Sequence, residues 1–170
     1  MTRYAAFLRG VNVGGVNLKM AEVAETFRNA GLADVRTILA SGNVIFAADS
    51  DAATLRDTIE TALRAQFGYE AWVLVYDLGA VKAILDGYPF EPEVDGYQSY
   101  VTFVSDSAVL DELSGLSGPD EKVARGDGVI YWQVPTSTTL TSTIGKTMGN
   151  RRFKSTTTTR NLRTLGKVLG

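Results

Sequence analysis

The stretch LRGVNVGGVNLKM, residues 8–20, joins a hydrophobic segment to an amphipathic one through a glycine-rich loop. Gly10, Gly14 and Gly15 permit positive φ angles and a close approach of the backbone to a neighbour. The hydrogen-bond donors of this stretch are Arg9, Asn12, Asn17 and Lys19. No carboxylate occurs before Glu22, and a helix start with free N–H groups attracts anions. The stretch therefore predicts a strand, a loop that binds an anion, and a helix.

The pattern on both sides of this loop predicts the first half of the fold. Residues 4–8 form a short apolar run typical of a buried strand, and apolar residues recur at helical spacing over 20–30, with Asn17 as the expected N-cap and Gly31 as the end. Strands are expected at 35–39, 44–48 and 71–76, with a helix capped by Ser50 or Asp51 and ended by Gly68 before the last of them. This β-α-β-β-α-β order is that of a ferredoxin-like fold.

The second half of the chain repeats this order of strands and helices in part. After a short helix capped by Asp77 and an acidic connector, the sequence predicts a strand at 100–104, a helix from Ser105 or Asp106, and a hairpin of 122–125 with 129–134. Helices are expected at 140–148 and 161–169, the latter capped by Thr159, with a further strand at 153–157. We therefore predict an α+β protein of two similar subdomains packed into one compact chain: a ferredoxin-like one (1–77), a helix and acidic connector (78–98), and a related βαββα unit (99–170) with a basic C-terminal helix.

The composition limits the chemistry. The 170 residues include no cysteine and no histidine, which excludes thiol catalysis, disulfides and a histidine base or metal ligand. We expect no metal site and no cofactor. No apolar run reaches the roughly 18–20 residues of a membrane span, and nothing resembles a signal peptide. A cytoplasmic protein without a membrane partner is expected.

Charge is distributed unevenly along the chain. The net charge is −1 over residues 1–76, −8 over 77–127 and +7 over 128–170. This asymmetry predicts either an anionic ligand for the basic tail or pairing between the tail and the acidic middle segment. In the connector, Glu91, Glu93 and Asp95 alternate in a manner that suits a hard cation, although an exposed linker is the preferred interpretation.

Two further motifs contain candidate ligand-binding residues. Ser41 and Asn43 flank Gly42 in an expected hairpin turn, whose proximity to the glycine-rich loop the sequence leaves open. Arg160 and Asn161 end a threonine run, and the guanidinium of Arg160 suits a phosphate or carboxylate. The loop itself is no known nucleotide motif, since Val16 and Asn17 occupy the Lys and Ser/Thr positions of a Walker loop.

Three of these segments together resemble a bacterial family, domain-of-unknown-function family 1697. They are LRGVNVGGVNLKM, SGNVIF (41–46) and TTRN (158–161) followed by LRTL. The resemblance covers essentially the whole chain and implies two α+β subdomains, the first ferredoxin-like; it implies no activity. The recurring family positions are Arg9, Gly10, Asn12, Gly14, Gly15, Met20, Ser41, Gly42, Asn43, Arg160 and Asn161. The family often has an aromatic residue after TRN, where this chain has Leu162.

The leading functional hypothesis is a binding module for a phosphate-bearing ligand, either a nucleotide or another phosphorylated small molecule or single-stranded RNA. One alternative is an enzyme that acts on a small phosphorylated or carboxylated substrate and stabilises negative charge with Arg9, Lys19 and Arg160, although no residue is marked as a general base and the catalytic residues are unknown. The other alternative is a structural protein that self-associates as a homodimer through its acidic and basic segments.

Overall fold

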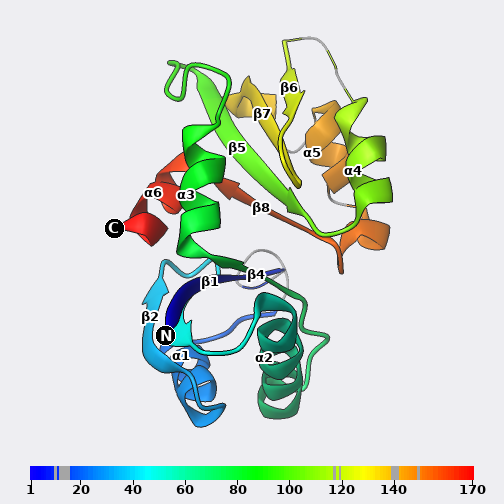
Figure 1. Ribbon diagram of the computed structural model, residues 1–170. Coiled ribbons are helices and arrows are strands. Elements are labelled where there is room, and N and C mark those ends of the chain that lie inside the picture. The colour runs from blue at the N-terminus through cyan, green and yellow to red at the C-terminus, as the bar shows by residue number, and fades with distance from the viewer. Residues whose placement is uncertain (10, 12–15, 117, 119, 139–141, 149) are drawn as a thin grey trace. The chain divides into compact units, whose positions relative to one another are not determined.

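The structure is a computed structural model of the chain (Figure 1). It describes residues 1–9, 11, 16–116, 118, 120–138, 142–148 and 150–170. The chain divides into two compact units. The first comprises Met1–Val81 together with Lys167–Gly170, and the second comprises Lys82–Gly166.

The first unit contains a four-stranded antiparallel sheet. Its elements are β1 (Thr2–Leu8), α1 (Met20–Asn29), β2 (Ala33–Ile38), β3 (Asn43–Ala48), α2 (Ala52–Phe67) and β4 (Val73–Asp77), followed directly by α3 (Leu78–Asp86). The strand order is β2-β3-β1-β4. Both the order of elements and the predicted hairpin of β2 and β3 are confirmed, so the first unit is ferredoxin-like.

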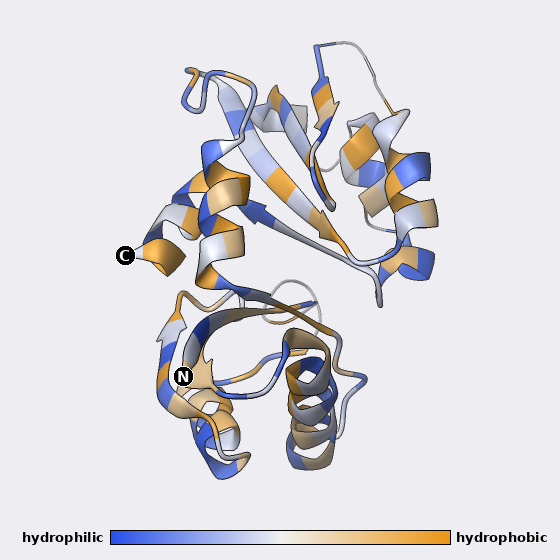
Figure 2. Ribbon diagram, in the orientation of Figure 1, coloured by the Kyte–Doolittle hydropathy of each residue, from blue (hydrophilic) through white to orange (hydrophobic). Residues whose placement is uncertain are grey.

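The core of the first unit lies between one face of this sheet and helices α1 and α2. Alternate residues of β1, such as Tyr4 and Leu8, pack there against Phe27 of α1 and Ile59 of α2. Figure 2 shows both hydrophobic and hydrophilic residues on each of these helices, as expected where a helix buries one face. The intervening β1 residues, such as Phe7, are apolar and buried as well.

Most of the predicted helix ends are confirmed. Asp51 caps α2 by accepting a hydrogen bond from the N–H of Thr54 at 2.8 Å, and Gly68 ends this helix with φ +65°. Gly31 follows α1 with φ +91°. The predicted N-cap of α1 is wrong: Lys19, and not Asn17, occupies that position, and its side chain makes no capping hydrogen bond.

The second unit has the same sheet order. It contains β5 (Tyr97–Val104), α4 (Ser107–Ser114), β6 (Lys122–Arg125), β7 (Val129–Pro135), α5 (Thr143–Met148), β8 (Thr157–Asn161) and α6 (Leu162–Leu169), with short 3-10 helices η1 (Thr136–Thr138) and η2 (Arg151–Phe153). The strand order is β6-β7-β5-β8. The expected βαββα unit is therefore present, and the further strand that the sequence predicts after it is the fourth strand of the sheet.

The C-terminal elements correct three sequence predictions. The strand expected at 153–157 lies at Thr157–Asn161, because pairing with β5 selects Thr157 and the four residues after it. The helix expected from residue 161 begins at Leu162, and its cap is Asn161 rather than Thr159. The helix expected at 140–148 is observed from Thr143, while residues 140 and 141 lie outside the described part of the chain.

The two units correspond in detail. In the first, Tyr4 of β1 lies opposite Phe46 of β3, and their rings stack with centroids 5.7 Å apart. In the second, Tyr100 of β5 lies opposite Trp132 of β7, and their rings stack at 4.4 Å. An aromatic pair, Tyr with Phe in the first sheet and Tyr with Trp in the second, therefore occupies the same register position in both sheets.

The backbone contacts at the ends of the central strands correspond too. The N–H of Leu8, the last residue of β1, donates to Gly42 O at 2.8 Å, and the N–H of Val104, the last residue of β5, donates to Gly128 O at 2.9 Å. The two units thus share one topology, and each position of one unit can be compared with the equivalent position of the other.

Part of the charge asymmetry is explained by ion pairs within the second unit. Arg152 of the basic tail pairs with Glu112 at 2.8 Å, and Arg163 pairs with Glu93 at 3.4 Å. These pairs are exposed and stabilise the fold only weakly. Because the tail and the acidic segment pair within one chain, the asymmetry requires no second copy, and self-association stays a prediction. No helix in the described part of the chain has the length and hydropathy of a membrane span.

Candidate functional site

The candidate site lies in the first unit, at the end of the sheet where β1 leads toward α1. The N–H of Arg9 donates to Trp72 O at 3.0 Å, which fixes the first residue of the connection. Val11 is buried, forms an isolated bridge with Val16, and belongs to the core, against which Leu18 also packs. The connection is therefore attached to the core at both ends. Four predicted binding residues, namely Gly10, Asn12, Gly14 and Gly15, lie outside the described residues.

The turn between β2 and β3 lies directly against this connection. Gly42 has φ +92°, and a Cβ atom there would lie 2.6 Å from Val11 Cγ2 and 2.9 Å from Leu8 Cβ. Only glycine fits such a position without displacement of its neighbours. The structure thus brings together two motifs whose proximity the sequence left open.

Ser41 and Asn43 organise that turn. Asn43 is completely buried, and its Nδ2 donates to Ile38 O at 2.8 Å and to Ser41 Oγ at 3.0 Å. A buried amide that is hydrogen-bonded in this way stabilises the local backbone. These contacts assign Asn43 a structural role in the turn, and direct contact of Ser41 or Asn43 with a ligand stays a prediction.

Three cations surround this end of the first unit. Arg9 is half-buried, and its burial lowers the pKa of the guanidinium below its ordinary value, because a low-dielectric environment disfavours the charged form. Lys19, like Asn17, is exposed. Arg64, which the sequence analysis did not single out, lies over the ring of Trp72 at 4.6 Å and donates to the carbonyl oxygen of Ala71 at 2.8 Å. No sequence signal identifies Arg64, since exposed arginine and lysine side chains are common on helices.

The start of α1 differs from its counterpart in the second unit. Between β5 and α4 the chain needs only residues 105–106, and the carboxylate of Asp106 accepts hydrogen bonds from the N–H groups of Ala108 at 2.8 Å and Val109 at 3.3 Å. Between β1 and α1 it uses residues 9–19, and Lys19 at the N-cap provides no side-chain acceptor. Among the described residues, the side chain at the N-cap position of α1 therefore provides no cap for the first-turn N–H groups, in contrast to Asp106.

Arg160 and Asn161 lie in the second unit, whereas the loop and the turn lie in the first. Arg160 is buried, and its Nη1 donates to Thr158 Oγ1 and to Thr159 O, both at 2.8 Å. The carbonyl oxygen of the Asn161 side chain accepts from Thr164 N at 2.8 Å and so caps α6. These contacts show structural roles for both side chains, and their binding of a ligand stays a prediction.

The cap that Asn161 forms on α6 has a counterpart at the end of β4. Asp77 accepts a hydrogen bond from the N–H of Ala80 at 2.8 Å at the start of α3, as Asn161 does three residues before Thr164. Both strands pass into their helices without a loop, so the last residue of the strand must satisfy the N–H groups of the first turn. The TTRN motif thus contains an architectural residue.

The described part of the chain contains no candidate metal centre, either at this site or elsewhere. No three His, Cys, Asp or Glu side chains gather there in a way that suits a metal ion. The site contains positively charged side chains and backbone N–H groups. The loop that leads into it is packed against the core at both ends.

Comparisons with other proteins agree with this fold. A conserved bacterial protein from Streptococcus pneumoniae, SP0830, has a similar structure, with a TM-score of 0.82 and 26% sequence identity over 99% of this chain and 97% of that one. No curated protein matches the sequence. The model of the family described as "Protein of unknown function (DUF1697)" matches residues 1–131, and the chain belongs to that family.

Proposed function

We propose that the protein binds a phosphate-bearing anion at the end of the first sheet, where the glycine-rich connection leads into α1. The observation that carries this proposal is the contrast between α1 and α4. The fold closes the strand-to-helix connection of the second unit with a carboxylate, Asp106, on the first-turn N–H groups. In the first unit a longer connection without a carboxylate leads into α1, and we assign to a bound anion the role that Asp106 has in the second unit.

The charge around α1 supports an anionic ligand. Residues 1–21 include three cations and no carboxylate. Arg9 is partly desolvated, and an anion beside it would recover the electrostatic stabilisation that burial removes. Lys19 adds an exposed ammonium next to the helix start, and the helix dipole acts in the same direction.

Burial favours a small ligand over RNA. Ferredoxin-like sheets that bind RNA do so on an open face with exposed aromatic residues. Here Ala5 and Phe7 of β1, and Val101 and Phe103 of β5, are at most 1% exposed. An RNA-binding sheet face is therefore not supported in either unit, and a nucleotide or another small phosphate ester is the preferred ligand class.

Isothermal titration calorimetry with inorganic phosphate, ribose 5-phosphate and AMP tests the proposal. Lys19→Ala removes an exposed side chain at the helix start and should weaken phosphate binding about tenfold without unfolding the protein. Arg36→Ala, an exposed cation of β2 in the same unit, is the matched control and should bind like the wild type. Equal effects of the two variants, or no heat with any of the three ligands, would contradict the proposal.

A further inference from the structure

The second unit contains a pocket of about 490 Å³ that is formed by the connector (residues 87–96, between α3 and β5), the start of β5, the start of β6 and β7. We infer that this pocket binds an uncharged, mainly apolar molecule that carries one N–H or O–H donor, such as an indole or a phenol. None of its lining residues belongs to the anion site of the first unit, so the inference goes beyond the proposed function and does not depend on it. The lining residues are Val94, Tyr97, Asp120, Glu121, Lys122 and Gln133.

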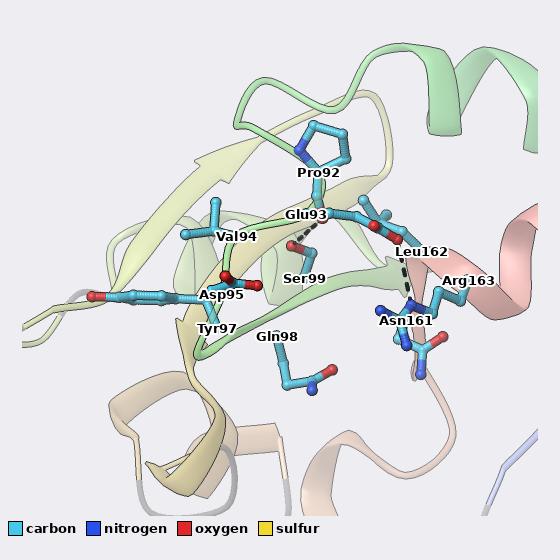
Figure 3. Close-up of a pocket in the computed structure, with 10 residues that line it drawn as sticks. All are labelled: Pro92, Glu93, Val94, Asp95, Tyr97, Gln98, Ser99, Asn161, Leu162 and Arg163. Carbon is cyan, nitrogen blue, oxygen red and sulfur yellow. Dashed lines mark hydrogen bonds and ion pairs between the residues drawn. The ribbon is translucent and has the colours of Figure 1, made fainter.

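The lining includes a buried carboxamide whose orientation is fixed. Gln133 of β7 is 1% exposed, and its Nε2 donates to Glu91 O at 2.7 Å and to Ser99 Oγ at 2.9 Å. The Ser99 hydroxyl has a single hydrogen, which it donates to Pro92 O at 2.9 Å (Figure 3). The Ser99 oxygen can therefore only accept from Gln133, just as the carbonyl oxygen of Glu91 can only accept. Both hydrogens of Gln133 Nε2 are thus used.

The amide oxygen of Gln133 is left as an acceptor without a donor. No N–H or O–H group in the described part of the chain donates to Gln133 Oε1. Among the described residues, the Tyr69 hydroxyl is the one side-chain polar group that is fully enclosed without a hydrogen-bond partner, so Gln133 Oε1 keeps access to the pocket that Gln133 lines. A buried acceptor without a donor is unfavourable, and a ligand that donates to it removes this cost.

The apolar wall of the pocket comes from the connector and the first residue of β5. Val94 and Tyr97 are 36% and 37% exposed, although most large hydrophobic residues of the described chain are buried. Figure 3, a view of the neighbouring pocket, shows both side chains directed away from Glu93 and Arg163. An apolar wall, an aromatic ring and one buried polar group in a cavity of this size are typical of small-molecule sites.

The charges of the lining favour an uncharged ligand. The Glu121 carboxylate accepts from two backbone N–H groups at the start of α5, both at 3.2 Å, so its charge is already engaged. The Lys122 ammonium lies over the ring of Phe90, 5.9 Å from its centroid. Asp120 and Lys122 are exposed and carry opposite charges two positions apart, so their fields largely cancel and are screened by solvent. The lining therefore selects neither an anion nor a cation.

Titration of the ¹⁵N-labelled protein with indole tests the inference, and benzofuran is the matched probe. Benzofuran has the shape of indole but an oxygen atom in place of the N–H group. We expect indole to shift the backbone amides of Val94, Tyr97 and Lys122 with a Kd about tenfold lower than that of benzofuran, because only indole can donate to Gln133 Oε1. Equal affinities, which would indicate apolar contact alone, or no shifts with indole would overturn the inference.

Variants separate the apolar wall from the hydrogen bond. Tyr97→Ala should weaken both probes by a similar factor and leave their ratio unchanged, whereas Gln133→Leu should bring the ratio close to one. If Gln133→Leu does not fold, because it also loses the bonds to the connector, the wild-type ratio and Tyr97→Ala decide. Leu39→Ala, which removes a 47% exposed hydrophobic side chain from the first unit, is the matched control and should change neither affinity. Equal weakening by Tyr97→Ala and Leu39→Ala would show non-specific hydrophobic binding and overturn the inference.

Discussion

Replacement of Gly42 by alanine tests the contact between the β2–β3 turn and the connection after β1. The added Cβ atom would lie 2.6 Å from Val11 Cγ2 and 2.9 Å from Leu8 Cβ. Neither neighbour is the free end of a long side chain: both residues are almost completely buried in the core. The substitution therefore requires the turn and the connection to move apart.

The expected cost has two parts. A side chain at φ +92° costs about 1–2 kcal/mol, and overpacking of a buried site costs typically about 1–3 kcal/mol more. The variant Gly31→Ala separates the backbone cost from the overpacking cost. Gly31 has nearly the same φ, +91°, but a Cβ atom added there would have no neighbour within 4 Å. The reduced entropy of the unfolded chain favours both variants equally and cancels from their difference.

The assay is urea unfolding followed by circular dichroism. We expect Gly31→Ala to lose about 1–2 kcal/mol of unfolding free energy and Gly42→Ala to lose about 2–5 kcal/mol. Phosphate binding should weaken in Gly42→Ala alone, because Val11 anchors the binding connection. Equal losses in the two variants would show that the close approach of the turn does not exist and would refute this reasoning.

Three further predictions concern single side chains. Tyr69→Phe should raise the unfolding free energy by about 1 kcal/mol in urea titrations, because the Tyr69 hydroxyl is buried and has no hydrogen-bond partner in the described structure; a loss of stability would contradict this. Asn161→Ala should lose about 1 kcal/mol with the cap of α6, whereas Asn161→Asp should retain it; equal melting temperatures of the two variants would argue against the cap. Burial raises the pKa of Tyr76 to about 12, although nearby Arg56 opposes the shift. A tyrosine in the unfolded chain ionises near pH 10. The stabilisation that comes from burying the neutral Tyr76 side chain is therefore complete below about pH 10 and is lost as the pH rises toward about 12. Alkaline melts should show this loss, and Tyr76→Phe should reduce it.

The sequence predicted the first unit well because local signals agree there. Apolar runs, Asp51 as a cap and glycines at the helix ends all indicate the same elements, and the resulting order has few alternative topologies. The C-terminal region was harder to predict. Its run of threonines has high β propensity over several registers, and only the pairing of Thr157–Asn161 with β5 selects the strand.

The candidate site was predictable in its residue types but not in its geometry. The absence of carboxylates before Glu22 is visible in the sequence, whereas the contact of Gly42 with Val11 depends on the path of the backbone. The same holds for Asn43, whose family motif does not reveal that its amide is buried in a turn. Asn17 was expected as a cap because asparagine favours that position, yet the chain continues to Lys19 before the helix begins.

The most direct test of the proposed anion site uses the two units as target and control in one experiment. Titration of the ¹⁵N-labelled protein with AMP should shift the backbone amides of Met20 and Ala21, at the start of α1, where Lys19 provides no side-chain cap. The amides of Ala108 and Val109, which Asp106 already caps, should not move. Shifts confined to the second unit, or no shifts at millimolar AMP, would contradict anion binding at α1.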